Sequence, residues 1–151
     1  MMQSAKIIIF TLLVITLAAC SRQPAMKDIN GHVIKLSAQK GKWIVLNYWA
    51  SWCKPCYQEI PALNAFAKRY HNQAMVLGVS YDRVPTEELI SLAAKLGVKF
   101  PTLASDPAGW LGIDNVPGLP ATYIVGPDGK LRQRLLGIQT ETSLAAAIGQ
   151  G

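Results

Sequence analysis

The sequence predicts a single α/β domain in which helices flank a central sheet. Residues 43–49 form a continuous run of β-branched and aromatic side chains, which is the pattern of a strand buried on both faces. Apolar residues then recur every three or four positions from Cys53 to about Tyr70, and this spacing indicates a helix. A second strand at residues 75–79 and a second helix at residues 86–96 follow. This alternation is typical of an α/β domain.

Turn and cap residues predict where several elements begin and end. Asn30-Gly31 is a type I′ turn signal, and residues 33–36 after it have the composition of a short strand. We therefore expect a small N-terminal hairpin. Thr86 is expected to cap the second helix, and Gly97 is expected to end it.

The last third of the chain predicts two more strands and a final helix. Residues 121–125 and 131–136 have strand composition, and the Gly-Pro-Asp-Gly sequence at residues 126–129 is a hairpin-type turn between them. Thr140 is expected to cap a helix that runs to about Ile148.

Composition limits the classes of function. The chain has 151 residues, half of them apolar, which suits one domain with its own core. Lys and Arg exceed Asp and Glu by six, but the basic residues are spread along the chain and form no stripe interleaved with aromatic residues. This distribution argues against nucleic-acid binding. We expect a monomer.

The first residues predict export and a lipid anchor. An apolar run at residues 7–17 follows Lys6, and it is shorter than the roughly 20 residues that span a bilayer. It is typical of a signal peptide. The sequence Leu-Ala-Ala-Cys at residues 17–20 resembles the bacterial lipobox. The resemblance implies cleavage before Cys20 and a lipid on its sulfur. The alternative is a secretory-signal cysteine that carries no lipid.

These signals divide the chain into three parts and place it outside the cytosol. We expect a lipoprotein signal peptide at residues 1–19, a lipidated tether at residues 20–26 and the folded domain at residues 27–151. An exported domain lies where disulfides persist. In a cell with two membranes this is the periplasm, and Ser21 after the lipobox resembles outer-membrane sorting.

Cys53 and Cys56 carry the chemistry. The N-terminus of a helix favours a thiolate, and Lys54 adds a nearby positive charge. We expect Cys53 to be the nucleophile and Cys56, one turn further on, to be the resolving thiol. A zinc site needs two more ligands, and the only histidines are His32 and His71. A static disulfide that closes so short a loop would contribute little stability. We expect no metal and no cofactor other than the redox-active Cys53–Cys56 disulfide.

The motifs around the cysteine pair resemble one family. The sequence WASWCKPC at residues 49–56 is similar to the active-site motif of the thioredoxin superfamily. EIP at residues 59–61 and VPGLPAT at residues 116–122 narrow the resemblance to the TlpA/ResA-type extracytoplasmic thioredoxins. The resemblance extends from about Gly31 to Ile148. It implies a thioredoxin-like fold, with a central mixed sheet flanked by helices, and thiol–disulfide oxidoreductase activity.

The resemblance also assigns residues that bind substrate. Pro120 is expected to be cis and to stand beside the cysteine pair, whereas the alternative is an ordinary loop proline. Leu119 is expected to offer backbone hydrogen bonds to the substrate. Trp52 should be partly exposed and shape the substrate surface, whereas Trp49 belongs in the core. Asp82, like the tyrosine before it, follows a strand at the sheet edge where ligands bind in open α/β sheets, but only its position singles it out.

Glu59 has two competing interpretations. Its place at the edge of the helical apolar face favours a solvated glutamate. In ResA-like proteins the matching glutamate is half-buried, tunes the thiol pKa values and takes the proton of the resolving cysteine. Cytoplasmic-type thioredoxins carry an aspartate where this chain has Asn47, and the loss of that base strengthens the case for Glu59.

Electron direction and partners follow from the resemblance alone. Pro55 resembles reducing members of the superfamily, although Lys54 acts in the oxidising direction. We expect the protein to reduce disulfides in exported proteins, apocytochrome c among the candidates, and to receive electrons from a membrane carrier of the DsbD or CcdA kind. The alternatives are a disulfide oxidase or isomerase, and a non-catalytic binding module for cytochrome c or metal-centre assembly.

Overall fold

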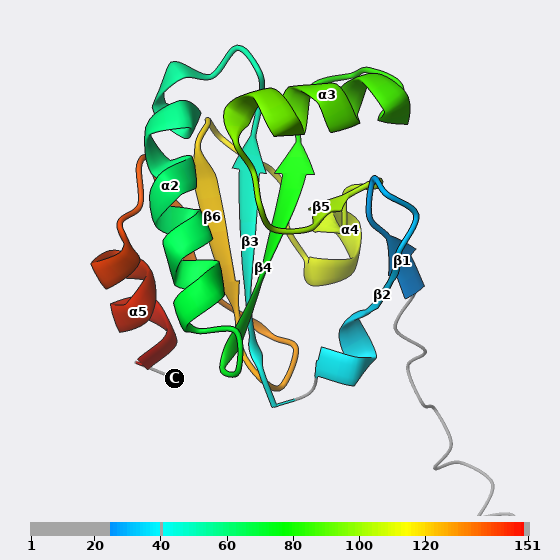
Figure 1. Ribbon diagram of the computed structural model, residues 1–151. Helices are drawn as coiled ribbons and strands as arrows, with labels where there is room; N and C mark the ends of the chain where they lie inside the picture. Colours follow the sequence, from blue (N-terminus) through cyan, green and yellow to red (C-terminus); the bar gives the residue numbers. More distant parts are fainter. Residues whose placement is uncertain (1–24, 40, 150–151) are drawn as a thin grey trace, which may run out of the picture.

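The computed structural model describes residues 25–39 and 41–149, and it confirms the predicted α/β fold (Figure 1). A five-stranded mixed sheet has the strand order β5-β4-β3-β6-β7. Strands β4 and β5 run parallel to β3 and β4 respectively, while β6 and β7 are antiparallel to their neighbours. The strands are β3 (Trp43–Trp49), β4 (Ala74–Ser80), β5 (Thr102–Leu103), β6 (Ala121–Val125) and β7 (Leu131–Leu136).

Helices and a small hairpin cover the sheet. The helices are α2 (Lys54–Arg69), α3 (Thr86–Leu96), α4 (Ala108–Leu111) and α5 (Glu141–Gly149). Strands β1 (Ala25–Lys27) and β2 (Val33–Lys35) form the N-terminal hairpin, and the 3-10 helix η2 (Leu36–Gln39) follows. Figure 1 shows α2 and α5 on one side of the sheet, with the hairpin and α4 on the other. No helix in the described part of the chain is long and apolar enough to cross a membrane.

Strand β3 is central because its side chains are buried on both faces. Val45 and Trp49 belong to the core that α2, α3 and α5 complete. Leu46 and Tyr48 belong to the opposite core, with side chains of the hairpin and α4. All four side chains expose no surface, and burial of each contributes about 1.5–3 kcal/mol. The predicted central strand and the predicted core position of Trp49 are confirmed.

The structure corrects two local predictions and confirms a third. Among the described residues only glycines have positive φ, so Asn30 cannot adopt the type I′ conformation. The hairpin loop is instead held by Asp28, whose Oδ1 accepts the backbone N–H of Asn30 and of His32. Helix α3 has Pro85 at its N-cap and no side-chain cap, so the predicted Thr86 cap is wrong. Gly97 ends α3 in the left-handed conformation, as predicted.

Other boundaries also differ from the sequence-based expectations. Ala25 and Met26 lie in β1 and not in a tether, because Met26 packs into the core beside the hairpin. The predicted signal peptide, Cys20 and Ser21 lie outside the described residues. Thr140 caps α5 as predicted, because its Oγ1 accepts the backbone N–H of Ser143 at 3.1 Å. Elements η2, β5 and α4 were not predicted.

Candidate active site

The end of β3 and the start of α2 position the two cysteines. Cys53 is the N-cap of α2, and its Sγ accepts the backbone N–H of Cys56 at 3.3 Å. The two residues form a disulfide. Cys53 is 4% exposed and Cys56 is fully buried. In the reduced protein the same N–H and the helix dipole would stabilise a thiolate at Cys53 more than at Cys56, which suits the predicted roles of nucleophile and resolving thiol.

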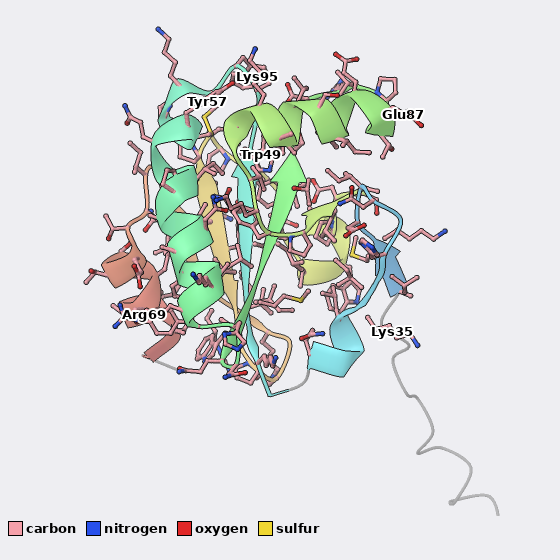
Figure 2. The ribbon with its side chains drawn as sticks, viewed as in Figure 1. Lys35, Trp49, Tyr57, Arg69, Glu87 and Lys95 are labelled. Carbon is pink, nitrogen blue, oxygen red and sulfur yellow. A yellow bond between two sulfur atoms is a disulfide. The ribbon has the colours of Figure 1, made fainter. Side chains whose placement is uncertain are left out.

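Exposed aromatic residues surround the cysteine loop. Trp52 is 67% exposed, Tyr81 is 41% exposed and Tyr57 is 37% exposed. Figure 2 shows Tyr57 at the N-terminal end of α2, with Trp49 beneath α3. Tyr57 donates from its hydroxyl to the carbonyl of Ser51 at 3.1 Å, so this ring is tied to the loop that leads into Cys53. Large exposed aromatic side chains are typical of surfaces that bind other proteins.

The peptide bond between Leu119 and Pro120 is cis, as the resemblance implied. Pro120 immediately precedes β6, and Ala121 pairs with Tyr48 near the end of β3. This pairing places the loop before β6 at the same end of the sheet as the cysteines. Leu119 packs partly against the core that contains Cys53 and Cys56.

Glu59 lies inside the protein, one turn of α2 after Cys56. Its side chain exposes no surface, so of the two interpretations the solvated glutamate is wrong. Its Oε1 accepts the Nδ2 of Asn47 at 2.6 Å, and its Oε2 accepts the backbone N–H of Gln139 at 3.0 Å. Burial raises the pKa of Glu59 to about 7, although these two hydrogen bonds act in the opposite direction. Glu59 can therefore gain or lose a proton near neutral pH.

Asn47 completes the surroundings of Glu59. Its Nδ2 also lies 3.1 Å from the hydroxyl of Thr122 on β6. Its Oδ1 is buried and has no hydrogen-bond partner among the described residues. A half-turn of the amide would bring Oδ1 opposite the carboxyl of Glu59, where it can accept from the protonated acid. The one amide can thus serve both protonation states of Glu59.

Sequence reasoning found most of these residues but missed some of their partners. Asn47 was noted only as the loss of a base, yet a polar side chain inside an apolar strand needs a buried partner, and this signal points to the contact with Glu59. The Gln139 N–H comes from a loop 80 residues further along the chain, and no local pattern indicates it.

The histidines lie apart from the cysteines. The Nδ1 of His32 is 3.0 Å from Asp28, and the Nδ1 of His71 is 3.0 Å from the carbonyl of Lys68. Within residues 25–39 and 41–149, no three His, Cys, Asp or Glu side chains are grouped so that they could hold a metal ion.

Comparisons with known proteins agree with this site. The profile of the AhpC/TSA family matches residues 20–134. The thioredoxin-like protein YneN of Bacillus subtilis is 32% identical over 122 residues, which cover 80% of this chain and 71% of YneN. The thiol-disulfide oxidoreductase ResA of Geobacillus kaustophilus is 31% identical over 120 residues, which cover 79% of this chain and 68% of ResA.

Solved structures share the fold. The structure of MTB dsbF, in mixed oxidized and reduced forms, has a TM-score of 0.66 and 27% sequence identity, and the match covers 85% of this chain and 95% of dsbF. The Cys53–Cys56 pair stands at the start of α2 on that shared fold. The chain therefore belongs to the AhpC/TSA family and is a thiol–disulfide oxidoreductase of the thioredoxin-like type.

Proposed function

We propose that this protein is a lipid-anchored, extracytoplasmic reductase of disulfides in exported proteins. The observation that carries the proposal is the cysteine pair itself. Cys53 caps α2 beside the exposed ring of Trp52, and Cys56 is buried one turn from a carboxyl that titrates near pH 7.

The reaction proceeds in two exchanges. The Cys53 thiolate attacks one sulfur of the substrate disulfide, a mixed disulfide forms, and one substrate thiolate leaves. Cys56 then attacks the Sγ of Cys53, which releases the second substrate thiolate and leaves the Cys53–Cys56 disulfide. Two electrons pass to the substrate. Glu59 takes the proton of Cys56 before the second attack, since a buried thiol cannot release it to solvent directly.

The loop before β6 supports binding of an extended substrate segment. No hydrogen bond within the described part of the chain uses the backbone N–H or C=O of Leu119. Both groups are therefore available to pair with a substrate strand next to Cys53. The cis Pro120 and the exposed Trp52 would flank that strand.

The proposed anchor rests on the motif at residues 17–20. Cys20 precedes Ala25, the first residue of β1, by five positions. Five extended residues span at most about 18 Å, so a lipid on Cys20 would keep the domain close to the membrane. The re-reducing partner is then a membrane electron carrier of the DsbD or CcdA kind.

A trapping experiment tests the proposed reaction. The Cys56→Ser variant of the full chain lacks the resolving thiol, so it should accumulate mixed disulfides between Cys53 and exported proteins. These complexes should dissociate when the mixed disulfide is reduced, and they should be absent from the Cys53→Ser/Cys56→Ser double variant. A biological effect that survives Cys53→Ser would instead favour the non-catalytic binding module.

Fractionation tests the anchor independently. The natural chain should incorporate a labelled fatty acid and sediment with membranes, whereas the Cys20→Ala variant should do neither. The anchor would be contradicted if the natural chain incorporated no fatty acid and sedimented with membranes to the same extent as Cys20→Ala. That result would not affect the redox proposal.

A further inference from the structure

The loop that delivers Cys53 is fixed at Ser51, two residues before the nucleophile. The backbone N–H and the hydroxyl of Ser51 donate to the two carboxylate oxygens of Asp82, each at 2.7 Å. The carbonyl of Ser51 accepts the hydroxyl of Tyr57 at 3.1 Å. Backbone and side chain of this one residue are therefore held together, and hydrogen bonds to a carboxylate are the stronger kind.

Asp82 is itself held rigidly. Its Oδ2 accepts the hydroxyl of Ser80 at 3.0 Å, and its backbone N–H donates to the same hydroxyl at 3.0 Å. Ser80 ends β4 opposite Trp49 of β3, and the N–H of Tyr81 donates to the Trp49 carbonyl at 2.8 Å. The carboxylate is thus attached to the sheet immediately beside the strand that precedes the cysteines.

We propose that Asp82 is a positioning residue for thiol–disulfide exchange. Acting through Ser51, it keeps Cys53 at the N-cap of α2 while a substrate disulfide is attacked and released. The inference rests on the exchange activity of Cys53 and holds for either direction of electron flow. Displacement of a nucleophile by even about 1 Å costs a large factor in rate, so a fixed loop has a direct consequence for catalysis.

The carboxylate also acts on Cys53 by its charge. Two residues span at most about 7 Å, and with the 2.7 Å contact to Ser51 and the reach of the cysteine side chain this puts Asp82 within roughly 14 Å of the Cys53 sulfur. A negative charge there opposes the thiolate, while Lys54 and the N-terminus of α2 favour it. Other titratable groups around Asp82 are Arg83 and Asp106, which line the same small cavity, and the hydroxyls of nearby tyrosines: Tyr48, Tyr57 and Tyr81.

Three substitutions separate position from charge. In Asp82→Asn the amide oxygen can accept the Ser51 N–H and the Ser80 hydroxyl, while the amide N–H₂ donates to the Ser51 hydroxyl, so the contacts survive and the charge is lost. Asp82→Ala removes both. Ser51→Ala keeps the charge and the backbone hydrogen bond but removes the hydroxyl contact.

Two quantities are measured. The first is the pKa of Cys53, which is determined from the absorbance of its thiolate as a function of pH. The second is the exchange rate constant per thiolate, with a small aromatic disulfide as the probe. Asp82→Ala should lower that rate constant about tenfold, Ser51→Ala should lower it less, and Asp82→Asn should stay within about twofold of the natural protein. Both Asp82 variants should lower the Cys53 pKa by about half a unit, and Ser51→Ala should leave it unchanged.

Asp128→Asn is the matched control, because Asp128 is an exposed carboxylate paired with Arg132 in the turn between β6 and β7. It should change neither quantity. A rate constant per thiolate in Asp82→Ala that equals that of the natural protein would overturn the positioning role. If Asp82→Ala does not fold, the other variants still test the inference. It is overturned if Ser51→Ala has the same rate constant per thiolate as the natural protein, or if Asp82→Asn leaves the Cys53 pKa unchanged.

Discussion

Glu59 in α2 and Asp28 in the hairpin loop are both buried carboxylic acids, yet their pKa values move in opposite directions. Glu59 exposes 0% of its surface and Asp28 exposes 5%. Burial raises the pKa of Glu59 to about 7 against only two neutral donors. Burial acts the same way on Asp28, but hydrogen bonds from His32 and Asn30 outweigh it and hold the pKa of Asp28 below its ordinary value.

The difference shows what separates a structural acid from one that exchanges protons. Asp28 receives two backbone N–H groups on one oxygen and lies 3.0 Å from the ring of His32 through the other. Its charged form is satisfied, so it stays ionised and closes a loop. Glu59 is buried more deeply than Asp28, and its two neutral donors do not offset the cost of burying its charge. It is therefore suited to carry a proton for Cys56.

The largest expected effect concerns the free energy of unfolding and how it depends on pH. The folded pKa of Glu59, about 7, lies above its ordinary value of 4.5, so between these values the folded state binds a proton that the unfolded state has released. Stability should therefore fall as pH rises through this window, by about 3 kcal/mol in total. Glu59→Gln mimics the neutral acid and should remove this loss.

The pH-dependent loss of stability is measured by denaturant unfolding of the natural protein and of Glu59→Gln between pH 4.5 and 8. The variant should gain about 3 kcal/mol relative to the natural protein across the window. Asp28 should behave oppositely, because its folded pKa lies below 3.8: its contribution is present above that pH and is lost as pH falls further. If the difference in stability between the natural protein and Glu59→Gln does not change with pH, the proposed contrast between Glu59 and Asp28 is wrong.

The next effect is on catalysis. Glu59→Gln cannot accept the proton of Cys56, so thiol exchange at pH 7 should slow by roughly 10²-fold, and the titration of Cys56 should shift. The deficit should shrink at high pH, where Cys56 ionises without help. Stopped-flow exchange between pH 6 and 10 follows this, and rates equal to those of the natural protein at pH 7 would remove the role.

Asp28→Ala should have a smaller effect, confined to stability. The change leaves the N–H groups of Asn30 and His32 without their partner, at a cost of about 2 kcal/mol. Exchange rates should not change, because the hairpin loop and the cysteines lie in different parts of the molecule. His32→Ala is the matched control, and it should cost less because His32 is 76% exposed. A slower exchange in Asp28→Ala would show that the two acids are not independent.

The smallest effect concerns the donor to Glu59. Asn47→Ala removes one of two hydrogen bonds that lower the pKa of Glu59, so this pKa should rise further, by about one unit. The midpoint of the pH-dependent stability loss should move with it. Thr122→Val is the control, since it removes a different contact of Asn47. An unmoved midpoint in Asn47→Ala would mean that the hydrogen bond from Asn47 has no influence on the pKa of Glu59.

The sequence predicted those parts of the fold that local patterns encode. Residues 43–49 combine β-branched and aromatic side chains without interruption, and they form the central strand. Strand β5 has two residues and exists because it pairs with β4, which is a tertiary contact that no local pattern contains. Asn30-Gly31 marked the place of the turn but not its type, because Asp28 holds a longer loop there.

The site was predictable to a similar extent. The cysteine pair and the cis Pro120 came from motifs. The burial of Glu59 was hidden by its charge, although its spacing from Cys56 matches that of the other buried residues of α2. The contacts from Gln139 to Glu59 and from Ser51 to Asp82 join segments 80 and 31 residues apart, and only the folded sheet brings these segments together.

The reduction potential of the Cys53–Cys56 pair tests the proposed reductase most directly. The purified domain is equilibrated with defined ratios of reduced and oxidised glutathione, and the fraction of free thiol is measured. A reductase should have a potential below about −200 mV, toward the value of thioredoxin. A potential near about −120 mV, as for a strong oxidant, would contradict the account and assign the protein to disulfide formation.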